Sequence, residues 1–112
     1  MKPEKQIQQE ILYFLHLLPS IKFFWRNNVG AVSAQYKGSS RFIKFGQAGL
    51  SDILGIMEDG KFLAIEVKSA KGKLTVKQEE FLNTVIQANG IGFIARSVKD
   101  VINNFKRLGY MK

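Results

Sequence analysis

The chain has 112 residues, of which 46% are hydrophobic, and this fits one globular domain over residues 1–112. It holds no cysteine and a single histidine, which excludes disulfides, cysteine nucleophiles and multi-histidine metal sites within one chain. No apolar run approaches the roughly 20 residues that span a bilayer, and the N-terminus lacks a secretory hydrophobic region. We therefore expect no membrane association and a cytoplasmic location.

The charge is strongly basic. Seventeen Lys and Arg oppose nine Asp and Glu, which gives a net charge of +8 and indicates a polyanionic partner such as nucleic acid. No acidic residue occurs from Ile11 to Ser51, whereas five cations lie there: Lys22, Arg26, Lys37, Arg41 and Lys44. A stretch of one charge sign is typical of a phosphate-facing surface, although a solvated basic surface is the alternative.

The first half of the chain predicts a helix followed by strands. Apolar residues recur at helical spacing between Pro3 and Pro19, and Ile21 to Trp25 is typical of a strand. The Gly-, Ser- and Asn-rich stretch Asn27–Ser40 predicts a loop or an irregular strand. Arg41 to Phe45 alternates charged and apolar residues as an edge strand does, and a glycine-containing turn follows.

The second half predicts a hairpin, a helix, a strand and a last helix. The hairpin joins Ile53 to Met57 with Phe62 to Val67. A helix beginning at Val76, a strand from Ile91 to Ala95 and a helix after Ser97 complete the chain. Because the hairpin strands are apolar on both sides, we expect an α/β fold with a mixed central sheet and helices on both faces.

The chemistry-bearing residues lie on this hairpin. A three-residue loop, Glu58 to Gly60 with the glycine in the left-handed conformation, would set Asp52 opposite Glu66, whereas a two-residue turn would not. Paired carboxylates repel unless a proton or a cation lies between them. A divalent cation that prefers oxygen ligands, Mg²⁺ or Mn²⁺, would satisfy both, with Lys68 one strand repeat away.

The combined pattern resembles a known nuclease family. Asp52, Glu66-Val67-Lys68, a glutamate on a preceding helix and Gln78 on a following one resemble the PD-(D/E)XK nuclease superfamily. Within it, the run Gly46 to Ile53 and the Lys-rich loop look like the VRR-NUC (virus-type replication-repair nuclease) domain. Ser51 stands where the superfamily label has proline, a residue that is not a ligand.

The resemblance implies a restriction-endonuclease-like core and a role for each matching residue. Asp52, Glu66 and the main-chain carbonyl of Val67 would hold Mg²⁺ or Mn²⁺, and Glu10 would be an outer ligand or hold a second metal. Lys68 would orient or deprotonate the attacking water or stabilise charge on the phosphate, and Gln78 would fix Lys68 or the phosphate. Lys71 and Lys73 are expected to contact DNA, together with Arg26, Lys37, Arg41 and Lys44.

Structural roles for the same residues stay open at this point. Gln78 also fits a capping box with Thr75, Glu10 could pair with a cation, and Asp52 and Glu66 could be merely structural. The function expected is a metal-dependent endonuclease selective for branched DNA, acting as a homodimer whose interface draws on Asn27–Phe45. The alternatives are a nuclease acting on linear duplex or its ends, and a non-enzymatic nucleic-acid-binding module.

Overall fold

The computed structural model describes the backbone of residues 1–27, 31–36, 39–44 and 49–112, and the side chains of residues 1–27 and 49–112. Three helices and six strands lie in these ranges. In chain order they are α1 (Glu4–Leu15), β1 (Ile21–Arg26), β2 (Ala31–Tyr36), β3 (Ser39–Lys44), β4 (Ile53–Met57), β5 (Phe62–Val67), α2 (Val76–Gln87), β6 (Ile91–Ala95) and α3 (Val98–Arg107).

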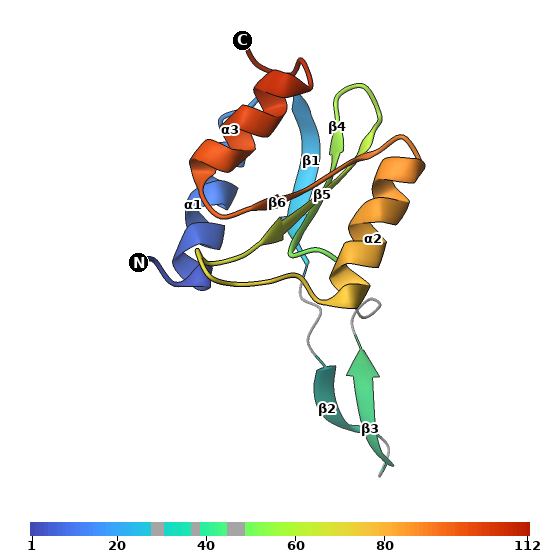
Figure 1. Ribbon diagram of the computed structural model, residues 1–112. Coiled ribbons are helices and arrows are strands. Elements are labelled where there is room, and N and C mark those ends of the chain that lie inside the picture. Colours follow the sequence, from blue (N-terminus) through green and yellow to red (C-terminus); the bar gives the residue numbers. More distant parts are fainter. Residues whose placement is uncertain (28–30, 37–38, 45–48) are drawn as a thin grey trace.

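Four strands form one mixed sheet in the order β1-β4-β5-β6. The β1–β4 and β4–β5 pairs are antiparallel, and β5–β6 is parallel, with α2 as the connection between those two strands. Figure 1 shows α1 and α3 on one face of this sheet and α2 on the other. The expected α/β fold with helices on both faces is therefore confirmed.

The segment after β1 differs from expectation. Ala31–Tyr36 is a regular strand rather than the loop or irregular strand expected, and it pairs with Ser39–Lys44 in a separate two-stranded sheet. Within the edge strand predicted at Arg41 to Phe45, residues 41–44 therefore pair with β2 and not with the four-stranded sheet, and Phe45 lies outside the described residues. In Figure 1 this hairpin extends away from the end of β1. The stretch is poor in large apolar side chains, so the burial pattern that would identify a strand was missing from the sequence.

Each sheet face has its own apolar core. The larger core joins Ile11 and Leu15 of α1 with the sheet and with Phe105 of α3. The smaller one packs Leu82 and Val85 of α2 against β4 and β5. The central strand β5 is buried on both faces from Leu63 to Val67, as the apolar sequence of the hairpin predicted.

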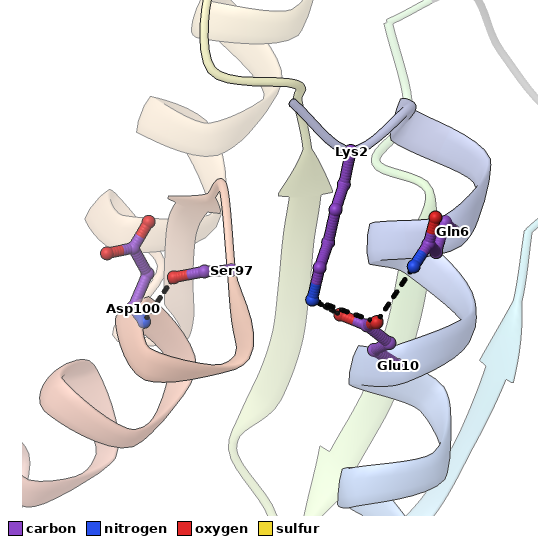
Figure 2. Close-up of polar contacts among 5 residues, drawn as sticks. All are labelled: Lys2, Gln6, Glu10, Ser97 and Asp100. Carbon is purple, nitrogen blue, oxygen red and sulfur yellow. Dashed lines mark hydrogen bonds and ion pairs between the residues drawn. The ribbon is translucent and has the colours of Figure 1, made fainter.

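Local capping residues fix where the last two helices begin. The Thr75 hydroxyl accepts from the Gln78 N–H at 3.1 Å, and the Gln78 side chain accepts in turn from the Thr75 N–H at 2.9 Å, which completes the capping box. The Ser97 hydroxyl accepts from the Asp100 N–H at 3.2 Å and begins α3 (Figure 2). Among the residues described, no helix combines the length and apolarity that a membrane crossing requires.

Candidate functional site

The β4–β5 hairpin sets the register of the two acids. Gly60 has φ +92° and its N–H donates to the Met57 carbonyl at 2.9 Å, while the Met57 N–H donates to the Lys61 carbonyl at 2.9 Å. This is the three-residue loop that the sequence predicted. Ile53 pairs with Ile65, so one step further along both strands Asp52 comes beside Glu66.

Glu66 lies in an environment that opposes its ionised form. Its side chain is only 1% exposed, its Oε1 accepts from Gln78 Nε2 at 3.1 Å, and its Oε2 is buried without a partner. Burial first, and then the adjacent Asp52 carboxylate, raises the pKa of Glu66 from 4.5 to about 9. The carboxyl group therefore needs either a proton or a cation.

Backbone contacts hold Asp52 in place. Its Oδ2 accepts from the Val67 N–H at 2.9 Å, across the hairpin, and its carbonyl accepts from the Asn27 N–H at 2.7 Å at the end of β1. The acid is thus tied to both neighbouring strands. Asp52 has a short side chain that is held by the backbone of the neighbouring strand. The Asp52–Glu66 pair is therefore preorganised for a shared ligand.

Gln78 performs two tasks at once. Its Oε1 closes the capping box, and its Nε2 donates to Glu66, so one side chain ties the start of α2 to the acid pair. The sequence interpretation had Gln78 fix Lys68 or the phosphate, and in the described part of the chain its side chain bonds Glu66 and not Lys68. Lys68 is half-buried beyond Glu66, and its positive charge partly offsets the raised pKa of that acid.

The acid pair fits a divalent cation. A carboxylate cannot donate a hydrogen bond, so when both acids are ionised Glu66 Oε2 has no partner unless a cation is bound. Oxygen donors of this kind suit Mg²⁺ or Mn²⁺, which usually retain several waters and need few protein ligands. Throughout the described part of the chain, no cluster of three or more His, Cys, Asp or Glu side chains offers a fuller set of ligands.

The structure does not bring Glu10 to the acid pair. Both Glu10 oxygens accept from Lys2 Nζ, at 2.9 and 3.0 Å, and Oε2 also accepts from Gln6 Nε2 at 3.3 Å (Figure 2). These partners, Lys2 first, lower the pKa of Glu10. Glu4, at the first turn of α1, is the acid of this helix whose charge acts on Glu66. The sequence interpretation did not single out Glu4.

The predicted DNA-contacting cations fall into three groups. Arg26 is exposed at the end of β1, and Lys71 and Lys73 are exposed in the loop between β5 and α2. The side chains of Arg41 and Lys44 lie outside the described residues, although their backbone forms part of β3, and Lys37 lies outside them entirely.

Arg96 braces the basic loop, a role that the sequence did not indicate. One of its guanidinium nitrogens, Nη1, donates to the carbonyls of Ser69 at 2.6 Å, Gly72 at 2.7 Å and Ala70 at 3.4 Å. An arginine that follows a strand carries no sequence signal for such contacts, because its partners are backbone carbonyls of a distant loop. The bracing holds the loop beside the strand that carries Glu66.

Taken together, fold and site define an α/β domain with a preorganised acid pair and a lysine at one end of its central strands. The family model of the VRR-NUC domain matches residues 3–99, and the chain belongs to this family. It is therefore a nuclease domain whose substrate is DNA. Comparisons with curated proteins and with solved structures gave no significant match.

Proposed function

We propose that this domain hydrolyses DNA phosphodiester bonds by PD-(D/E)XK-type chemistry that depends on Mg²⁺ or Mn²⁺. The observation that carries the proposal is the buried, partnerless Oε2 of Glu66 next to Asp52. A bound cation would satisfy that oxygen, neutralise the phosphate and acidify a water. Asp52 and Glu66 would hold it, with the Val67 carbonyl as a further ligand.

The remaining site residues have separate roles in the proposal. Lys68 directly follows the end of β5, two residues beyond Glu66, and would position the attacking water or stabilise charge on the phosphate. Gln78 would fix the orientation of Glu66 through their 3.1 Å hydrogen bond. Glu10, whose carboxylate is satisfied by Lys2 and Gln6, has no ligand role in the proposal.

The finer substrate and assembly proposals rest on size and charge. A small domain with one acid pair has little surface for base-specific recognition, so we propose selectivity for the shape of branched DNA. Two cuts at a branch point would need two sites, which a twofold homodimer supplies. The β2–β3 hairpin, which is separate from the main sheet, is the proposed source of the interface. Light scattering on the free protein would contradict the dimer if it gave the 12.7 kDa mass of one chain.

The test of the activity is a substrate panel with matched variants. Labelled linear, nicked, flap and four-way DNA would be incubated with Mg²⁺ or with chelator, using the parent chain, Asp52→Asn and Glu80→Gln. Glu80 is an exposed acid of α2 and serves as the control. We expect cleavage with Mg²⁺ alone, lost in Asp52→Asn and kept in Glu80→Gln. Cleavage that persists in chelator, or in Asp52→Asn, would contradict the proposed site.

A further inference from the structure

Helix α2 leaves part of its sheet face uncovered. Its residues Leu82 and Val85 pack on Leu54 and Ala64, over β4 and β5. The same face continues onto the edge strand β1, where Trp25 pairs with Leu54 and Phe23 pairs with Ile56. Paired residues of antiparallel strands lie on the same side of a sheet, so Phe23 and Trp25 belong to the α2 face but lie beyond the helix.

The uncovered part carries exposed aromatic rings. Phe23 is 59% exposed and Trp25 is 37% exposed, and their ring centroids are 5.6 Å apart at an interplanar angle of 48°. Ile56 and Phe62 extend the apolar surface at 42% and 37% exposure. Phe24, between the two rings, points to the other face and packs on the larger core. The two rings therefore form an aromatic pair that faces solvent.

This aromatic pair is continuous with the candidate metal centre. Trp25 lies in the row of Leu54 and Ala64, and the next row on this face, two residues along each strand, holds Asp52 and Glu66. From Trp25 to Glu66 the path is two residues along the strand direction and two strands across the sheet. The two backbones are therefore about 12 Å apart. A few nucleotides of one DNA strand can span that distance.

The charges of β1 favour a polyanion over a second copy of this chain. Lys22 and Arg26 are both exposed and flank the aromatic pair in the sequence of the edge strand, and Arg26, which pairs with Ile53, lies on the larger-core face. An antiparallel self-pairing of β1 centred on Phe24 would set Lys22 opposite Arg26 twice, and the two chains would each carry a net charge of +8. A polyanion bound along this edge of the sheet removes the repulsion.

We propose that Phe23 and Trp25 form a stacking platform for unpaired bases of a DNA strand that leads to the acid pair. The proposal deepens the proposed function, on which it rests, by naming single-stranded segments as part of the substrate. Aromatic side chains bind single strands because every base has a π-face, and flanking cations bind the phosphates. A fully paired duplex keeps its bases stacked on each other and gains little from the platform.

The chain provides its own reporter, because Trp25 is its single tryptophan. The probes are a thymidylate oligomer of about 12 nucleotides, within the usual site size of single-strand grooves, and a duplex of equal length. Titrations contain chelator, so that no cleavage occurs, and follow both Trp25 fluorescence and probe anisotropy. We expect saturable quenching by the single strand. Absence of quenching at concentrations where anisotropy reports binding would overturn the proposal.

Variants separate stacking from general attraction. Phe23→Ala and Trp25→Ala are expected to weaken single-strand binding about 5- to 100-fold, the range for loss of one stacked base, and duplex binding less than about twofold. Trp25→Phe, which keeps a ring, should retain single-strand affinity. Tyr13→Ala is the matched control, because Tyr13 is 71% exposed on α1, across the sheet. An equal loss for both probes would overturn the stacking role.

Two further outcomes keep this inference distinct from the proposed activity. If the parent chain cleaves no DNA with Mg²⁺, the proposed function fails, while selective quenching would still establish the platform. If cleavage occurs but Phe23→Ala binds single strands like the parent, the platform alone fails. A dimeric mass in light scattering that falls to one chain in Phe23→Ala would show that a second copy covers the rings, and this would also overturn the proposal.

Discussion

Replacing Glu66 by glutamine tests the electrostatics of the acid pair without any substrate. Glutamine has the shape of a protonated glutamate, and its amide can donate toward Asp52 while its oxygen still accepts from Gln78. Glu66→Gln therefore imitates the neutral form that burial favours. In chelator, we expect the variant to fold and to be more stable than the parent at neutral pH.

The sign and size of this effect follow from the pKa of Glu66, which rises from 4.5 to about 9 on folding. Between these values the folded state holds a proton that the unfolded state has lost, so the free energy of unfolding falls as pH rises. The slope is at most about 1.4 kcal/mol per pH unit. From pH 4.5 to pH 7 the parent would lose about 3 kcal/mol relative to Glu66→Gln, and near pH 4.5 the two would be similar.

Urea unfolding of both proteins between pH 5 and pH 8, in chelator, measures this difference. Glu80→Gln removes an exposed carboxylate of α2 and should follow the parent curve. Added Mg²⁺ should stabilise the parent at pH 8 and leave Glu66→Gln unchanged, because a ligand that binds only the folded state raises its stability. A variant that is less stable than the parent at pH 7, or a difference independent of pH, would refute the reasoning.

Two other predictions concern the lysine and the glycine turns. Lys68→Ala should lower cleavage about 10²- to 10⁴-fold yet keep Mn²⁺ affinity in calorimetry, since an ammonium group is not a ligand; lost affinity would contradict separate roles. Gly49→Ala should cost at least about 2 kcal/mol in urea unfolding, because a Cβ there would lie 2.7 Å from the Lys77 carbonyl oxygen at φ +90°. Gly60→Ala, at φ +92° with nothing within 4 Å, should cost about 1 kcal/mol, and equal losses would contradict the steric argument.

The parts of the fold that depend on neighbouring residues could be predicted from the sequence. The loop Glu58 to Gly60 sets the hairpin register through one glycine conformation, and the capping box at Thr75 fixes the start of α2. Both signals lie within a few residues of the structure they determine. The β2–β3 pairing had no such signal, because backbone hydrogen bonds between strands leave no mark in a sequence that lacks large apolar side chains.

The contacts around Glu66 depend on how distant elements pack, and this limits what the sequence could establish. The pairing with Asp52 follows from the hairpin alone. The hydrogen bond from Gln78 to Glu66 requires the start of α2 to pack directly over Glu66. The sequence does not indicate this packing, because the capping box is by itself a sufficient reason for a glutamine at position 78. The three carbonyl contacts of Arg96 likewise join residues 24 to 27 positions apart, beyond any local pattern.

Glu4 and Glu10 differ in their angular position around helix α1, and this difference can be calculated from the sequence. Helical spacing alone admits both acids, since each lies three residues from Ile7. Measured at about 100° per residue from Ile11, which is fully buried, Glu4 is displaced by about 20° and Glu10 by about 100°. Glu4 is therefore aligned by angle with the face that packs on the sheet, but at the first turn of the helix it is exposed, and its charge contributes least among the causes that raise the pKa of Glu66. Glu10 lies at the side, where Lys2 and Gln6 satisfy it. The angle from the most buried residues, rather than the presence of an acid on an amphipathic helix, therefore shows that Glu10 is turned away from the sheet.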